Sequence, residues 1–230
     1  MNRFTSTCLL LLTALPGLAA VNDDPVLVKV MFDEIEVRRA DGDGVLAWDI
    51  EAWIGRDIDK LWLKAEGERD DGDSKANEYQ LLYSRAVSDF WNLNAGWRGD
   101  SIPDRDWFVL GLQGLAPYFV EVDANLFIGG SGSSGLRINI EREFLLTRRV
   151  SLAPELELNA FADDDKAAAR GSGVSDIDAA LRLHYRLQPN FAPYAGVVWE
   201  QFIGETRGLR RGIGEDTSEF QLVIGINGWF

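Results

Sequence analysis

Apolar and polar residues alternate along most of the chain after residue 20. The segment 217–230 shows the pattern clearly, because every second position is apolar from Phe220 to Ile226 and the segment ends on the aromatic Phe230. A period of two residues is that of a β-strand whose two faces meet different environments. An apolar alternating segment with a terminal aromatic is typical of the closing strand of an outer-membrane β-barrel.

Turn-forming residues divide the alternating pattern into segments of strand length. The connections between these segments alternate between brief and mostly longer ones, as expected for short periplasmic turns and longer outer loops. An even strand number also fits a closed barrel. We predict twelve strands, near residues 26–38, 45–55, 60–68, 77–87, 90–98, 106–115, 118–128, 135–145, 150–161, 174–187, 191–203 and 217–230.

The face opposite the apolar one carries charges. In 174–187, for example, Leu181 and Leu183 alternate with Arg182 and His184. A soluble barrel places its apolar face inside. Here, instead, the inward face would carry the charges. No later stretch is apolar for the roughly 20 residues that a membrane-spanning helix needs. The sequence therefore predicts an all-β fold, namely a transmembrane antiparallel outer-membrane β-barrel of twelve strands over residues 21–230.

The first twenty residues predict export. A short basic start with Arg3, an apolar run from residue 8 to 15 and small residues up to Ala20 form the pattern of a cleaved signal peptide. Cleavage would remove Cys8, the single cysteine of the chain. The mature protein would then contain no disulfide, thiolate metal site or cysteine nucleophile. We expect residues 1–20 to be the signal peptide and the mature chain to lie in the bacterial outer membrane.

Aromatic residues are predicted to mark the two membrane interfaces. Trp and Tyr are enriched where a membrane meets water, and barrels carry aromatic girdles at both levels. The sequence contains eight Trp residues, more than strand propensity alone explains. We place Trp48, Trp97, Phe108, Trp199 and Phe220 at the loop side, and Trp91, Tyr118, Tyr185, Phe191 and Phe230 at the turn side.

Charge narrows the possible partners. The formal net charge is −14, which argues against nucleic acid and favours cations. The predicted outer loops, among them 69–77, 162–173 and 204–216, should be solvated and mobile. Their acidic clusters, which include Asp70, Asp71 and residues 163–165, lack the spacing of a calcium loop. We interpret these clusters as solvated loop charge.

The inventory of soft metal ligands is almost empty. Copper prefers thiolate, thioether and imidazole ligands, and the predicted mature chain offers only Met31 and His184. The alternation directs His184 inward, whereas a lipid-modifying barrel enzyme needs a Ser/His pair that faces lipid. No nucleophile-elbow, zinc-protease or phosphate-loop motif is present. These observations predict that the protein is not an enzyme.

Carboxylates on neighbouring strands form the candidate metal site. Pairing through the connections at 162–173 and 188–190 places Glu157 near Asp178 and Asp178 near Glu200. Oxygen ligands suit Cu(II) transiently and select poorly against other divalent ions. Arginines on the same inward faces favour the alternative of a salt-bridged network that braces or plugs the barrel. The candidate metal residues are Glu157, Asp178, Glu200 and His184.

Several segments resemble the copper resistance protein B family, and together they cover nearly all of the predicted mature chain. They are LAWDIEAWIG at 46–55, DKLWLKAEGE at 59–68, GLQGLAPY at 111–118, LLT at 145–147, GSG at 171–173, LRL at 181–183, FAPYAGVVWE at 191–200, GED at 214–216 and WF at 229–230.

The resemblance implies an outer-membrane barrel that acts in copper tolerance together with a periplasmic multicopper oxidase. Copper ions and outer-membrane lipid are then the expected partners. Family members commonly carry a Met- and His-rich stretch before the barrel, and residues 21–26 hold none. The alternatives are a lipid-modifying outer-membrane enzyme and a structural or adhesive barrel with no metal role.

Overall fold

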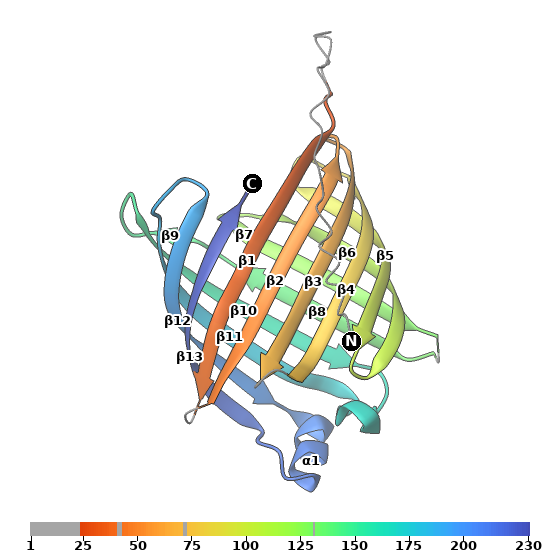
Figure 1. The fold of residues 1–230 in the computed structure, drawn as a ribbon. Coiled ribbons are helices and arrows are strands. Elements are labelled where there is room, and N and C mark those ends of the chain that lie inside the picture. Colours follow the sequence, from red (N-terminus) through yellow and green to blue (C-terminus); the bar gives the residue numbers. More distant parts are fainter. Residues whose placement is uncertain (1–23, 41–42, 71–72, 131) are drawn as a thin grey trace, which may run out of the picture.

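The computed structural model describes residues 24–40, 43–70, 73–130 and 132–230, so the predicted signal peptide lies outside the described residues. A single antiparallel sheet curls into a barrel (Figure 1). No helix among the described residues is long and apolar enough to cross a membrane. The strands are β1 (Leu27–Ala40), β2 (Asp43–Gly55), β3 (Asp59–Asp70), β4 (Asp73–Ala86), β5 (Trp91–Ser101), β6 (Asp104–Ala116), β7 (Val120–Gly129), β8 (Ser134–Glu141), β9 (Phe144–Leu145), β10 (Val150–Phe161), β11 (Gly173–Tyr185), β12 (Phe191–Phe202) and β13 (Ser218–Trp229).

The barrel wall has twelve strands, as predicted. The two-residue β9 and the longer β8 both pair with β10, so they form one wall strand with a short break between them. Consecutive strands pair around the wall, and β13 pairs with β1 to close it. Closure leaves no unpaired edge, which would be costly in lipid.

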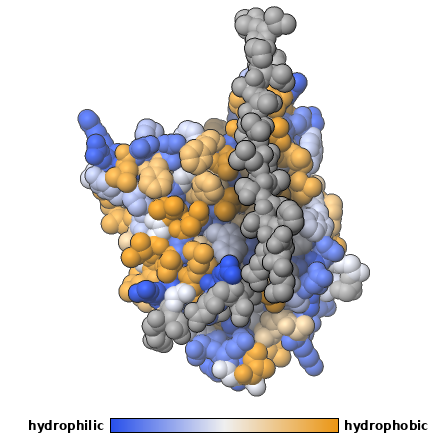
Figure 2. Space-filling view, viewed as in Figure 1, coloured by the Kyte–Doolittle hydropathy of each residue, from blue (hydrophilic) through white to orange (hydrophobic). Residues whose placement is uncertain are grey.

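The two faces of the wall are those that the alternation predicts. The outward side chains of β13 are apolar and exposed, and Leu222 and Ile224 are 62% and 72% accessible. Hydrophobic side chains cover much of the outer surface in the view of Figure 2. Charged side chains such as Glu36, Lys64 and Arg182 are buried inside the barrel. The fold is therefore apolar outside and polar inside, the reverse of a soluble barrel.

Exposed aromatic residues support the predicted girdles. On the loop side, Trp97 lies across from Phe108, and Trp199 lies across from Phe220. The Trp199 indole donates a hydrogen bond to the Ser218 hydroxyl at 3.0 Å, so its polar edge is satisfied where the wall ends. The turn-side residues Tyr118, Tyr185, Phe191 and Phe230 are all exposed, whereas Trp48 and Trp91 are partly buried.

The predicted outer loops are more ordered than we expected. Strands β3 and β4 extend to Asp70 and from Asp73, so the expected loop 69–77 is mostly strand, while Asp71 lies outside the described residues. The segment 162–173 contains the short helix η1 (Lys166–Ala168), and 204–216 contains α1 (Gly204–Gly212). The prediction of a long loop at 69–77 was wrong, whereas many residues of 162–173 and 204–216 are exposed to solvent as predicted.

Local chemistry explains the ordered segments. Glu205 in the first turn of α1 and Arg210 and Arg211 in its last turn complement the helix dipole. Thr206 is buried and bonds the Ser175 hydroxyl at 3.1 Å, which ties α1 to the end of β11. The Asp165 carboxylate accepts hydrogen bonds from two backbone amides of η1. This loop carboxylate therefore caps a helix instead of standing free in solvent.

A β-bulge in β1 brings two adjacent acidic side chains into the lumen. Phe32 pairs with Ile50 and Glu34 pairs with Asp49, so Asp33 has no partner residue on β2. An extra residue of this kind breaks the strict alternation of a strand. The Asn227 side chain donates a hydrogen bond to the Asp33 carbonyl at 3.0 Å and satisfies the displaced backbone. Both Asp33 and Glu34 consequently contribute charge to the interior.

Phe230 is expected to matter for closure of the barrel. Its backbone exchanges two hydrogen bonds with Val30, at 3.1 and 2.9 Å, and its ring lies 5.9 Å from that of Phe32. Deleting Phe230 should lower the free energy of unfolding by about 2 kcal/mol, since each bond contributes about 1 kcal/mol net. Urea unfolding in detergent micelles measures this free energy of unfolding. Phe230→Ala, which keeps both backbone bonds, should lose less, and equal losses would show that only the ring matters.

Candidate metal site in the barrel lumen

The most deeply buried ion cluster is centred on Arg182 of β11. Its guanidinium lies 3.1 Å from Glu36 and 2.6 Å from Glu34, both on β1, and it also pairs with Glu155 of β10. The Tyr194 hydroxyl donates to Glu36 at 2.9 Å. The first strand, β1, therefore meets the three consecutive strands β10, β11 and β12 at one charged cluster.

Gly225 of β13 makes room for this cluster. A Cβ atom at Gly225 would lie 2.5 Å from the Tyr194 ring and 2.7 Å from Cβ of Glu36. Real side chains do not approach so closely, so only glycine lets the ring lie against the wall. The position of the Tyr194 hydroxyl depends on that close approach.

Two further clusters brace the other side of the lumen. Arg137 of β8 pairs with Glu78 at 3.0 Å and Glu66 at 3.2 Å, on β4 and β3. Lys64 of β3 pairs with Glu51 at 2.7 Å and Asp123 at 3.1 Å. Lys64 and Glu51 lie on neighbouring strands, whereas the pairs of Arg137 and the pair of Lys64 with Asp123 join strands that are not neighbours in the wall. The predicted salt-bridged network is therefore present.

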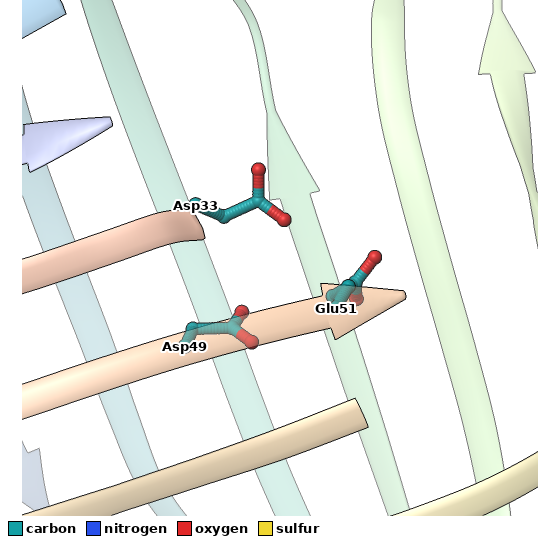
Figure 3. Close-up of side chains that lie close together, drawn as sticks. All are labelled: Asp33, Asp49 and Glu51. Carbon is teal, nitrogen blue, oxygen red and sulfur yellow. The ribbon is translucent and has the colours of Figure 1, made fainter. Parts of the chain in front are cut away.

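Not every lumen carboxylate is neutralised by that network. One carboxylate oxygen from each of Asp33, Asp49 and Glu51 lies within 4.8 Å of the other two (Figure 3). The bulge in β1 places Asp33 beside Asp49 and Glu51 of β2. Asp49 Oδ1 is buried and accepts no hydrogen bond from a described group. Lys64 pairs with Glu51 alone among the three, so the triad holds three carboxyl groups against one paired cation.

The predicted carboxylate row has the predicted register. Glu157 lies directly across from Asp178, and Asp178 lies directly across from Glu200. Glu157 is drawn towards Arg137, 3.4 Å away, and joins the bracing network. Asp178 Oδ1 is buried without a hydrogen-bond donor among the described residues. The row lies along the wall, and its ligand atoms do not converge as those of the triad do.

His184 is separate from the row. It lies six residues along β11 from Asp178, which is about 20 Å in a strand at about 3.3 Å per residue. Its ring lies 4.8 Å from the Tyr194 ring and it sits across from Ser151, on the inner face. His184 and Asp178 therefore do not bind one ion together, and the four predicted residues do not form a single site.

Strict alternation could not reveal the triad. It predicts that Asp33 and Glu34 point to opposite faces, and only the bulge directs both inward. The available signal was the acidic density of residues 33–36, three carboxylates in four residues, on a strand that is otherwise apolar or basic.

The comparisons with known proteins agree on the family. The sequence profile described as copper resistance protein B precursor (CopB) matches residues 26–230. Copper resistance protein B of Escherichia coli is 38% identical over 213 residues, covering 92% of this chain and 72% of that protein. Its homolog in Pseudomonas syringae pv. tomato is 39% identical over 212 residues, covering 91% and 72%. The chain belongs to the copper resistance protein B family.

Solved structures support the fold of this family member. The NanC porin has a TM-score of 0.55 at 14% identity, and the KdgM porin has a TM-score of 0.51 at 14% identity. Each comparison covers 88% of this chain and 99% of the porin. At such identity the likeness concerns the fold alone. The CopB-family chain is an outer-membrane β-barrel, as its sequence predicted.

Arg182→Met should destabilise the barrel strongly. Removing the guanidinium leaves Glu155 without its cation, and leaves the fully buried Glu36 and the adjacent Glu34 to share Arg38 alone. Removing one partner of a buried ion pair lowers the free energy of unfolding by about 3–5 kcal/mol. Urea unfolding in micelles should show the loss. Arg85→Met is the matched control, because Arg85 pairs with Asp59 at an exposed turn end and its loss should change little.

Proposed function

We propose that this barrel handles copper ions at the outer membrane, by letting them pass along its acidic lumen. The family supplies the link to copper, and copper is the cargo of the barrel in this proposal. The periplasmic partner implied by the family resemblance is a multicopper oxidase, which would receive or oxidise the ion. Export through a cleaved signal peptide at residues 1–20 is part of the same proposal.

The observation that carries the proposal is the Asp33, Asp49 and Glu51 triad. Its three carboxylates converge, and the buried Asp49 oxygen has no donor among the described residues, so a cation would satisfy it. Carboxylate oxygens suit Cu(II) better than Cu(I), which prefers sulfur and imidazole. A site of this kind binds weakly and selects poorly against other divalent ions. Weak binding fits passage better than storage.

The row of Glu157, Asp178 and Glu200 would act before or after the triad. Glu200 lies two residues from the loop end of β12, whereas Glu51 lies four residues from the turn end of β2. Asp33 and Asp49 lie at the middle of their strands, so the triad sits deeper in the barrel than Glu200 does. On neighbouring strands, Asp178 lies directly across from Glu200, and Glu200 lies directly across from Glu219. Such a wall attracts cations into the lumen mouth.

A structural barrel without a metal role is the second candidate. The ion pairs of Arg182 with Glu36, of Arg137 with Glu78 and of Lys64 with Asp123 cross the lumen and would narrow any path. A lipid-modifying enzyme has less support, because it would need a Ser/His pair that faces lipid and His184 lies on the inner face.

Replacing the triad carboxylates separates these candidates. The variant Asp33→Asn, Asp49→Asn, Glu51→Gln should reduce Cu(II) entry into vesicles that contain the purified barrel by at least about tenfold, equivalent to about 1.4 kcal/mol of lost attraction. Copper tolerance of a deletion strain carrying the variant should fall with it. Folding is checked in the same samples by the heat-dependent migration of the barrel on gels.

The matched control removes three charges from exposed positions outside the lumen, with Asp57→Asn, Asp89→Asn and Asp216→Asn. It should conduct Cu(II) like the natural protein. A second variant, Glu157→Gln, Asp178→Asn, Glu200→Gln, tests the row in the same assay. Unchanged Cu(II) entry and copper tolerance in both lumen variants, with folding intact, would favour the structural barrel.

A further inference from the structure

The side chain of Lys64 on β3 links the triad to a carboxylate of β7. Its ammonium nitrogen lies 2.7 Å from a Glu51 oxygen and 3.1 Å from an Asp123 oxygen, so one cation serves two carboxylates. Only 7% of the Lys64 side chain is accessible to solvent. Because a buried ammonium group without a partner is costly, Lys64 must keep at least one such contact in every state of the lumen.

Glu51 is shared between Lys64 and the triad. One of its oxygens lies within 4.8 Å of ligand oxygens of Asp33 and Asp49 (Figure 3), and the same carboxylate accepts the ammonium group. A cation held by the triad would therefore lie close to that ammonium group, and like charges at such a distance repel each other. The ion pair of Lys64 with Glu51 thus opposes cation binding at the triad.

Lys64 has two other contacts that it can keep without Glu51. Asp123 is held in position, because its second carboxylate oxygen accepts a hydrogen bond from the Asn125 amide at 2.7 Å. The Trp62 ring, two residues away on β3, lies 5.7 Å from the ammonium nitrogen and attracts it by a cation–π interaction. Leaving Glu51 therefore costs Lys64 one of its two carboxylate partners and does not strand its charge.

We propose that Lys64 competes with the metal ion for Glu51. In the absence of a cation the ammonium group binds both Glu51 and Asp123, and it withdraws onto Asp123 when a cation enters the triad. Its return to Glu51 favours release, which keeps the triad a place of weak binding. This inference rests on the proposed function, and it adds the residue that sets the affinity of the triad for a passing ion.

Lys64→Leu tests the competition directly. Leucine has no charge and offers no metal ligand, so the variant should bind Cu(II) at least about tenfold more tightly, because a charged hydrogen bond no longer competes for Glu51. Isothermal titration of the purified, detergent-solubilised barrel with a copper(II) salt measures the affinity. Lys60→Leu is the matched control on β3 and should bind normally, since the described contacts of Lys60 are with the Asp57 carbonyl and the Trp53 ring.

Asp123→Asn should change the affinity in the opposite direction. Lys64 then has no carboxylate to withdraw to, so Cu(II) binding should weaken by about fivefold or more. Glu121→Gln, two residues away on β7, is the control for the general loss of one negative charge. If Lys64→Leu does not fold, this comparison decides alone, and binding no weaker in Asp123→Asn than in Glu121→Gln would overturn the proposal.

Combining the two changes separates competition from bulk charge. In a barrel that already carries Lys64→Leu, adding Asp123→Asn should weaken Cu(II) binding no more than adding Glu121→Gln, because the competing ammonium group is absent. If Asp123→Asn weakens binding equally with and without Lys64, the two residues act only through their charge and the proposal is wrong.

The triad variant Asp33→Asn, Asp49→Asn, Glu51→Gln distinguishes failure of this inference from failure of the proposed function. If Cu(II) binding is lost in the triad variant but Lys64→Leu binds like the natural protein, the triad is a metal site and Lys64 does not compete. If the triad binds Cu(II) only after Lys64→Leu, Lys64 competes but the natural protein does not use the triad for passage. Equal binding by the natural protein, the triad variant and Lys64→Leu would contradict both proposals.

Discussion

The structure depends on how its buried charges are neutralised. A barrel that turns its apolar face outward must enclose its polar side chains, and an enclosed charge without a partner is costly. Arg182, Arg137 and Lys64 meet this constraint by reaching carboxylates across the lumen. The register of the wall and the close approach at Gly225 are set by the same requirement, because each positions a partner for a buried charge.

Incomplete neutralisation is what gives the lumen a possible function. The cations of the network do not match all of its carboxylates, and the surplus collects in the triad at β1 and β2 and along the wall of β10 to β12. In the proposed function, this surplus of oxygen ligands is what attracts a copper ion into the lumen. The arginine ion pairs and the carboxylates without a paired cation therefore have opposite effects. The ion pairs stiffen and narrow the lumen, while in the proposed function the carboxylates attract ions into it.

The loop end of the barrel has a different chemistry from its lumen. There the segment around η1 brings Asp165 and Arg170 against β6, and Asp165 pairs with both Arg105 and Arg170. Ion pairs at this end therefore join a loop segment to a wall strand, whereas those of the lumen join wall strands to one another.

The sequence by itself determined the barrel. Two-residue alternation predicted the twelve wall strands, the polar interior and the cross-strand row of Glu157, Asp178 and Glu200, because each depends on local periodicity and on consecutive antiparallel pairing. The sequence also carried the family resemblance that the comparisons confirmed. Only the tertiary structure decided that Asp33 and Glu34 both enter the lumen, that His184 lies apart from Asp178 and that two loops are helical. A bulge, a separation across a curved wall and a loop packed on a strand end all arise from contacts between residues distant in sequence, which periodicity does not encode.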